Sequence, residues 1–397
     1  MSTQEEIISD RTIKISSLFT TGLALFSMFF GAGNLIFPLL IGKSMGTHVS
    51  FGIIGLGITA VAVPFLGLVA IILFQANCQH FFSRIGKTPG MLLLLLLQAI
   101  LGPFGVIPRL VTLIHAMAKP YLFEISLPFF SVLIACIIFT LSFKRHRLIG
   151  LLGSVLTPVL LLALGTLIFL GLTNGSPLTP SSISPKDCFL EGLIGGYNTM
   201  DLIAAFLFAT LILPHFQKET EVADPVRRQK SIFKKMVYSS AIAVFLLLLT
   251  YVGLCLVSAK HANSLDPSYL PEQMLGAIAF KLLGPFGGAI AAVAVITACL
   301  TTIITLVSIF SDYLEKDLSK GKISARNSLL LTLLISTLFA NLGFKGISAF
   351  LSPILQIVYP GLILLTLLNL LHALYGYKTV RIPVFTTFTF SAMLYLA

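Results

Sequence analysis

The stretch that decides the fold is Leu25–Gly46, which reads LFSMFFGAGNLIFPLLIGKSMG. It is apolar enough to cross a membrane, yet glycines and an asparagine stand at its centre and Pro38 follows. These residue types are unfavourable inside a helix. In hydrocarbon, a break in a helix is tolerated only where other groups satisfy the freed backbone. The stretch therefore predicts a membrane helix that is interrupted near its middle for a functional reason.

The composition of the whole chain is that of a membrane protein. Of its 397 residues, 56% are hydrophobic and 10% are charged, whereas a soluble domain has about 25% charged residues. Apolar runs of about 20 residues recur along the chain, and each can cross a bilayer core about 30 Å thick. We therefore expect an all-α polytopic membrane protein, because a β-barrel would show strands of alternating polarity.

About eleven segments are predicted to span the membrane, with twelve as the alternative, and the last of them ends at Ala397. The predicted spans are 16–42, 50–76, 90–117, 126–143, 148–172, 191–213, 235–258, 285–311, 327–341, 347–371 and 383–397. Residues 1–15 precede them and are expected to form a cytoplasmic tail.

Positive charge is distributed unevenly between the loops on the two sides of these spans. Of the 26 Lys and Arg residues, 19 fall on the side of the N-terminus, 6 fall on the other side, and Arg109 lies inside a span. Cytoplasmic loops are enriched in Lys and Arg, so the N-terminus is predicted to be cytoplasmic. The net charge of +11 therefore reflects topology, and we expect the lipid bilayer but no nucleic acid as a partner.

The two halves of the chain share an interrupted helix at the same position. The first span of one half contains FFGAGNLIFP, and the first span of the other contains GGYNTMDLIA. Paired interrupted helices indicate the binding site of a transporter built from inverted repeats. The expected five-plus-five arrangement has a first repeat at 16–172, an extracytoplasmic loop at 173–190, a second repeat at 191–371, and a C-terminal loop with a final helix at 372–397.

The first interruption offers groups for both ions and carboxylates. Gly31 and Gly33 lower the cost of unwinding, and Asn34 adds an amide. The carbonyls freed around Ser27 and Phe30 would face a cation, and the N-terminus of the following half-helix would face a carboxylate. The alternative is that the glycines only let helices pack closely, but the neighbouring asparagine and proline favour a break.

Asp201 lies in the middle of the sixth predicted span. A charged residue at mid-depth costs at least about 2.5–3.5 kcal/mol on insertion scales, so such a residue is a functional candidate. Arg109 is the only basic residue inside a predicted span. A structural ion pair between Asp201 and Arg109 is therefore one interpretation, and a role of either residue in coupling is the other.

The eighth predicted span contains ACLTTIITL, in which Thr301 and Thr302 lie three and four residues after Ala298. This spacing places both hydroxyls on the helix face of the Ala298 carbonyl. Two hydroxyls and a carbonyl form a set of hard oxygen donors that suits Na⁺. The alternative is that the threonines only bond back to preceding carbonyls of their own helix, as they often do in membrane helices.

The sequence contains no enzyme motif that we can identify. The seven histidines have no metal-binding spacing, and there is neither a serine elbow nor a phosphate-binding loop. We therefore expect a protein that is not an enzyme and has no cofactor. A membrane-embedded enzyme acting on lipids would need clustered acids, and a passive channel or binding protein is the remaining class.

Four segments together resemble a known family. They read SMFFGAGNLIFP (27–38), LGPFGVIPR (101–109), EGLIGGYNTMDLIAA (191–205) and ACLTTIITL (298–306). In this order and spacing they resemble the bacterial branched-chain amino acid:cation symporters, whose fold is similar to that of LeuT-type transporters. The likeness covers essentially the whole chain, and its most specific parts are the two interrupted helices.

The resemblance implies sodium-coupled uptake of leucine, isoleucine and valine across the bacterial cytoplasmic membrane by alternating access. By position, it implies substrate contacts from Gly31, Ala32, Gly33, Asn34, Tyr197, Asn198 and Thr199. It implies Na⁺, as the coupling ion, at Ser27, Phe30, Ala298, Thr301 and Thr302. It gives no settled role to Asp201 or Arg109. A proton-coupled amino acid transporter of the same fold, working through Asp201 or His115, is the alternative.

Overall fold

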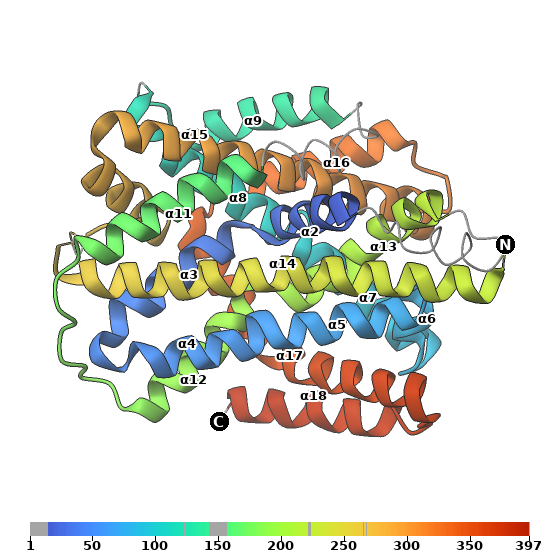
Figure 1. Ribbon diagram of the computed structural model, residues 1–397. Coiled ribbons are helices and arrows are strands. Elements are labelled where there is room, and N and C mark those ends of the chain that lie inside the picture. The colour runs from blue at the N-terminus through green and yellow to red at the C-terminus, as the bar shows by residue number, and fades with distance from the viewer. Residues whose placement is uncertain are drawn as a thin grey trace, which may run out of the picture.

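The computed structural model describes residues 15–122, 124–142, 157–220, 224–264, 266 and 268–396, and within these residues every regular element is a helix. Most of the long helices run side by side along one direction (Figure 1). The α-helices are α2 (Ile15–Phe29), α3 (Ala32–Met45), α4 (Val49–Gly57), α5 (Val63–Leu73), α6 (Cys78–Ser83), α7 (Lys87–Leu101), α8 (Val106–Ala118), α9 (Leu127–Leu141), α11 (Thr157–Thr173), α12 (Pro185–Thr199), α13 (Asp201–Glu219), α14 (Pro225–His261), α15 (Met274–Tyr313), α16 (Ala325–Ala340), α17 (Gly343–Tyr375) and α18 (Arg381–Leu396). Short 3₁₀ or π segments are η1 (Gly46–His48), η2 (Ile58–Ala62), η3 (Lys119–Tyr121), η6 (Ala262–Ser264), η7 (Pro271–Gln273) and η8 (Leu314–Leu318).

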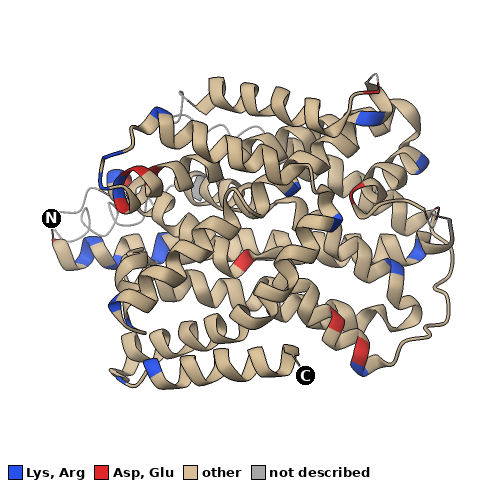
Figure 2. Ribbon diagram, turned by 180° about the vertical axis from the view of Figure 1, so that it is seen from behind, with Lys and Arg blue, Asp and Glu red and all other residues tan. Residues whose placement is uncertain are grey.

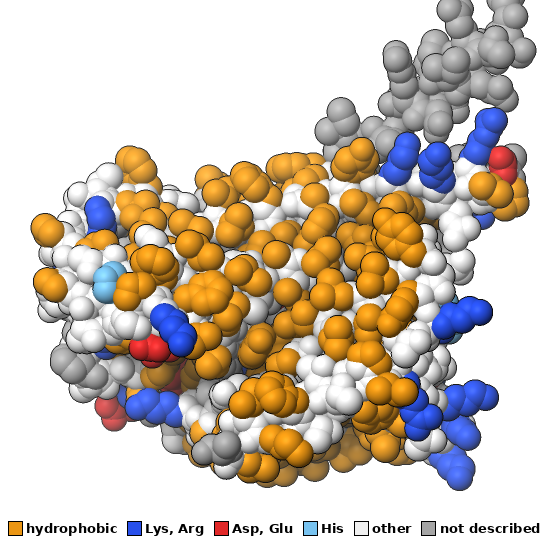
Figure 3. Space-filling view, turned by 90° about the horizontal axis from the view of Figure 1, so that it is seen from below, with side chains coloured by type: hydrophobic (Ala, Val, Ile, Leu, Met, Phe, Trp, Pro, Cys, Tyr) orange, Lys and Arg blue, Asp and Glu red, His pale blue; other side chains and the backbone are white. Residues whose placement is uncertain are grey.

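The surface of the bundle is that of a multi-pass membrane protein. Among the described residues, six helical segments are long and apolar enough to cross a membrane. Most charged residues lie toward the two ends of the helices (Figure 2), while hydrophobic side chains cover the face between them (Figure 3). Large apolar side chains such as Leu162 and Phe169 on α11 are exposed. Hydrocarbon, unlike water, gives such a surface a favourable environment.

The helices follow the predicted spans, and one span contains a break that was not predicted. The span predicted at 90–117 lies within the apolar segment Lys87–Tyr121, but residues Gly102–Gly105 divide it into α7 and α8. Gly105 has no room for a side chain, since a Cβ there would clash with the backbone of Ile100. The tail at 1–14, residues 148–156 of the fifth predicted span and Ala397 lie outside the described residues.

Close packing of α3 on α14 fixes the first half of the chain against the second. A Cβ at Gly42 would clash with the backbone carbonyl of Cys255, so the two helices approach to backbone distance there. One turn away from each residue, the Ser258 hydroxyl donates to the Leu39 carbonyl at 2.6 Å. Small residues that permit such close approach are the usual basis of helix association in membranes.

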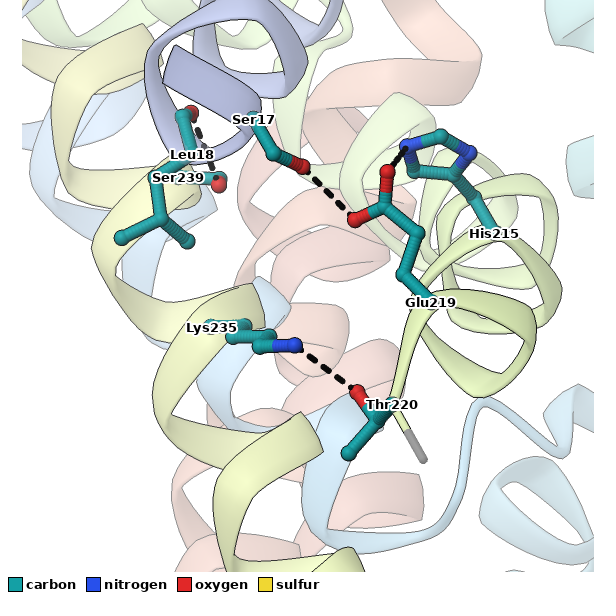
Figure 4. Close-up of polar contacts among 7 residues, drawn as sticks. All are labelled: Ser17, Leu18, His215, Glu219, Thr220, Lys235 and Ser239. Atoms are coloured by element: carbon teal, nitrogen blue, oxygen red, sulfur yellow. Dashed lines mark hydrogen bonds and ion pairs between the residues drawn. The ribbon is translucent and has the colours of Figure 1, made fainter. Parts of the chain in front are cut away.

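Polar contacts join α2, α13 and α14 at the end of the bundle where α2 begins (Figure 4). The Ser17 hydroxyl donates to the Glu219 carboxylate at 2.6 Å, and the same carboxylate lies 3.4 Å from His215 Nε2. The Ser239 hydroxyl on α14 donates to the Leu18 carbonyl at 3.0 Å. These contacts hold the start of α2 against α13 and α14.

Substitution of Gly42 tests whether the contact between α3 and α14 depends on a missing side chain. We expect Gly42→Ala to lower the free energy of unfolding by about 1–3 kcal/mol, the usual cost of overpacking a tight site. The measurement is the thermal stability of the purified protein in detergent. Gly165→Ala in α11 is the control, because nothing lies within 4 Å of its Cβ position. Equal stability of the two variants would contradict the interpretation.

Candidate functional site

The first predicted break is present and separates α2 from α3. Helix α2 ends at Phe29 and α3 begins at Ala32. The side chain of Asn34 closes the break, because its Oδ1 accepts a hydrogen bond of 3.1 Å from the Gly31 N–H. The same N–H also lies 2.7 Å from the Phe29 carbonyl, so this backbone donor at the break has two acceptors within the chain.

The second predicted break is also present, and it falls at Met200. Helix α12 ends at Thr199 and α13 begins at Asp201, while Met200 adopts a left-handed conformation with φ +64°. A side chain in this conformation costs of order 1–3 kcal/mol. The neighbouring glycine Gly196 has a different role, because a Cβ there would clash with Thr59 and so it permits close helix packing.

The two breaks lie directly against each other. A Cβ built on Gly33 would be 3.2 Å from both the Asn198 carbonyl oxygen and Thr199 Cα. Beside this contact is a cavity of about 20 Å³. Its lining residues come from both broken helices, from α7, α8 and α15, and are Met28, Phe29, Gly31, Gly33, Asn34, Leu101, Val106, Arg109, Thr199, Met200, Asp201, Ala204, Phe208, Thr302 and Leu306.

Four of the seven residues predicted to bind substrate line this cavity, and Ala32, Tyr197 and Asn198 do not. The Tyr197 ring stacks on Tyr359, with ring centroids 4.8 Å apart. The Asn198 side chain donates to the Ile194 carbonyl at 2.9 Å, within its own helix. Of the predicted set, Gly31, Gly33, Asn34 and Thr199 therefore line the cavity, and most of its other lining residues are apolar.

A buried hydrogen-bonded network connects the two breaks. Asn34 Nδ2 donates to Asp201 Oδ1 at 2.6 Å and also to the Tyr251 hydroxyl. The Tyr251 hydroxyl in turn donates to Asp201 Oδ2 at 2.6 Å. The Asp201 carboxylate also lies at the N-terminus of α13, where the helix dipole favours a negative charge. Tyr251 was not predicted, because a single tyrosine in an apolar stretch of α14 gives no signal in the sequence.

Arg109 does not form the predicted structural pair with Asp201. Its Nη1 donates to the Asn198 carbonyl at 2.9 Å, at the C-terminal end of α12, where the helix dipole favours a cation. Phe37 and Phe344 lie against its guanidinium, with ring centroids 5.5 and 5.3 Å from Cζ. The pairing fails because each group has other polar partners, even though both line the same cavity.

The residues predicted to hold Na⁺ lie where α2 meets α15. The Thr302 hydroxyl is 3.2 Å from the Ser27 carbonyl and 3.0 Å from the Ala298 carbonyl. The Thr301 hydroxyl donates to the Ala298 carbonyl at 2.7 Å. Both threonines thus bond back to their own helix, as the alternative interpretation holds, but Thr302 also contacts the other helix. The Ser27 hydroxyl is buried and has no hydrogen-bond partner, so this junction is rich in oxygen atoms.

The fold and the site define a class: multi-pass helical membrane proteins in which two interrupted helices meet beside a buried cavity. The chain resembles Mhp1 in its inward-facing conformation with a TM-score of 0.63 and 15% identity, over 95% of this chain and 88% of that one. It also resembles a manganese transporter of Eremococcus coleocola, with a TM-score of 0.60 and 14% identity over 97% and 87% of the two chains. At these identities the likeness establishes the fold.

The sequence then defines the family. The family model described as branched-chain amino acid transport protein matches residues 14–396, and the chain belongs to this family. The branched-chain amino acid permease BrnQ of Bacillus subtilis (strain 168) is 28% identical over 377 residues, which cover 93% of this chain and 84% of that protein. BrnQ of Corynebacterium glutamicum is 30% identical over 364 residues, with coverages of 90% and 82%. The resemblance to branched-chain amino acid transporters in four sequence segments is thus confirmed.

Removal of the Tyr251 hydroxyl tests the network between the breaks. We expect Tyr251→Phe to lower the free energy of unfolding by about 1–3 kcal/mol, because the buried Asp201 carboxylate loses a donor. Tyr238→Phe on the same helix is the matched control, since Tyr238 is exposed. Thermal denaturation of both purified variants gives the comparison, and a Tyr251→Phe variant as stable as the control would contradict a stabilising network.

Proposed function

We propose that the protein is a secondary active transporter that takes up leucine, isoleucine and valine together with Na⁺. Membership of the branched-chain amino acid transport protein family supports the substrate class. The cavity beside the breaks supports it as well, because Met28, Phe29, Leu101, Phe208 and Leu306 give it an apolar wall. An apolar pocket separates side chains that differ by one methylene by only about 1–3 kcal/mol. The three amino acids are therefore expected to compete for one site.

The observation that carries the sodium coupling is the meeting of oxygen atoms from α2 and α15. The carbonyls of Ser27 and Ala298 both lie within hydrogen-bonding distance of the Thr302 hydroxyl. The carbonyl of Phe30 follows one turn after Ser27, in the break itself. A cation bound to these atoms would hold α2 against α15 and would bias the equilibrium toward conformations in which they touch.

The energetics of such coupling are sufficient for accumulation. One positive charge that moves down a membrane potential of about 100 mV releases roughly 2.3 kcal/mol. Because a tenfold ratio corresponds to about 1.4 kcal/mol, this supports an accumulation of about 40-fold before a sodium gradient is added. Substrate crosses unchanged, so the proposed activity needs no catalytic residue and no cofactor.

The proposal includes a five-plus-five inverted repeat of about eleven spans in the bacterial cytoplasmic membrane. It is supported by two helices that are broken at corresponding places, α2–α3 and α12–α13, as is typical of inverted-repeat transporters. The repeats would be residues 16–172 and 191–371. The excess of Lys and Arg in loops on the side of the N-terminus supports a cytoplasmic N-terminus.

Proton coupling is the second candidate, and Asp201 is the observation that favours it. Its side chain is 1% exposed and is hydrogen-bonded to Asn34 and Tyr251. A carboxyl group at mid-depth is a typical element of proton pathways in transporters. This candidate predicts uptake that persists without Na⁺, collapses with a protonophore and is lost in Asp201→Asn.

The sodium proposal is tested by uptake of radiolabelled isoleucine into proteoliposomes, with external Na⁺ replaced by choline at constant pH. We expect uptake to fall to background in choline. Thr302→Val and Thr301→Val are expected to raise the Na⁺ concentration for half-maximal uptake by about tenfold or more, because each removes one oxygen ligand of the ion. Thr297→Val on the same helix is the control, because the hydroxyl of half-buried Thr297 bonds back to the Val293 carbonyl of its own helix.

The possible outcomes separate the candidates. Uptake that is unchanged in choline would exclude sodium coupling and would direct attention to Asp201. Equal effects of the Thr297 and Thr302 substitutions would contradict the proposed location of Na⁺ at this junction. Absence of uptake under every gradient, in protein shown to be folded, would exclude the substrate class itself.

A further inference from the structure

One edge of the Arg109 guanidinium has no partner within the protein. Arg109 is 1% exposed, and its Nη1 is bonded to the Asn198 carbonyl. Its Nε and Nη2 are buried and have no hydrogen-bond partner. These two nitrogens carry the parallel N–H groups with which arginine binds both oxygens of a carboxylate. The free edge is therefore the one that recognises carboxylates.

Two aromatic rings hold this edge in a fixed orientation. Phe37 of α3 and Phe344 of α17 lie within 5.5 Å of the guanidinium carbon, and α3 and α17 are separate elements of the bundle. Packing against the rings restricts the orientation of the guanidinium. Its N–H groups lie in the guanidinium plane, where they stay available to a ligand. A buried charge with unmet donors is unfavourable, so a chain that maintains it has a use for a ligand there.

A negative group lines the same cavity. Asp201 borders it together with Arg109, yet its carboxylate accepts hydrogen bonds from Asn34 and Tyr251. Each of its two oxygens accepts one of these bonds and can accept another. One cavity thus holds a cation and an anion that do not neutralise each other directly. A zwitterion with adjacent positive and negative groups matches this arrangement.

We propose that Arg109 binds the α-carboxylate of the substrate through Nε and Nη2, and that Asp201 binds its α-ammonium group. This inference rests on the proposed function, because it concerns the site of the transported amino acid. The N-terminus of α3 adds backbone donors for the carboxylate. The apolar side chain then faces Met28, Phe208 and Leu306. The cavity of about 20 Å³ has room for little more than one water, so binding requires the broken helices to separate.

The test compares three ligands that share the same side chain. L-Leucine has both charged groups, L-leucinol has only the ammonium, and 4-methylpentanoate has only the carboxylate. The measurement is the half-saturating concentration of each ligand in a thermal-shift titration of the purified protein in NaCl, because a ligand that binds the folded state raises its stability.

We expect leucine to bind the wild-type protein at least tenfold more tightly than either analogue. In Arg109→Gln, affinity for leucine should fall at least tenfold, to near that for leucinol, while leucinol is unaffected. In Asp201→Asn, the affinity for leucine should fall toward that for 4-methylpentanoate, while the affinity for 4-methylpentanoate is unchanged. Arg109→Lys keeps the charge but loses the bidentate geometry. Its affinity for leucine should lie between those of the wild type and Arg109→Gln.

Arg381→Gln is the matched control, because Arg381 also lies over a phenylalanine ring, Phe385 at 6.0 Å, but is exposed at the start of α18. It should change none of the affinities. A parallel loss of leucine and leucinol binding in Arg109→Gln would show a merely structural arginine and overturn the proposal. Equal binding of leucine and leucinol to the wild-type protein would also overturn it, and this result needs no variant to fold. Absence of binding by leucine, isoleucine and valine to folded wild-type protein would instead reject the proposed function, and this inference with it.

Discussion

The structure depends on one constraint: two helices are broken inside a membrane, and the backbone groups freed by the breaks need partners. The side-chain amide of Asn34 contributes to this at the first break. Its oxygen closes the break between α2 and α3 through the Gly31 N–H, and its nitrogen reaches Asp201 at the start of α13. One residue therefore satisfies the first break and connects it to the second. In hydrocarbon there is no water to replace these bonds, so the position of each broken helix depends on the other.

Not every polar group at the breaks is satisfied in this way. The Ser27 hydroxyl, the side-chain oxygen of Asn198 and two nitrogens of Arg109 are buried without hydrogen-bond partners. Such groups are rare in folded proteins and each needs an explanation. These three residues lie beside the junction of the two breaks, where a ligand can supply the missing partners. The chain thus keeps free at its centre the polar groups that a soluble core would pair.

Much of this arrangement could be predicted from the sequence, because the breaks contain residues that are unusual in the middle of a membrane helix. The glycines and Asn34 mark the first break, and Asp201 marks the second. The spacing of Thr301 and Thr302 from Ala298 marks their shared helix face. The sequence could not give the partner of Arg109, because an intramembrane charge can be met by a carbonyl as well as by an acid. Nor could it give Tyr251, whose role arises only when α14 packs against both breaks. The break at Gly102–Gly105, which sets the direction of α8, was visible as LGPFG but has no unique structural meaning in so apolar a chain.

The position of the oxygen-rich junction next to the first break has a consequence for coupling. The Ser27 carbonyl contacts the Thr302 hydroxyl. Ser27 lies only four residues before Gly31, where Asn34 closes the break. A change in the orientation of α2 would therefore act on the proposed ion ligands and on the cavity together. The start of α2 is held by Ser17 against Glu219, on the same α13 that begins with Asp201. Helix α2 and the break that follows it connect these three places, so a ligand that favours one arrangement at any of them would bias the others, and the bias would be equal in both directions. The proposed coupling between ion and substrate then needs no pathway beyond one helix and the break at its end.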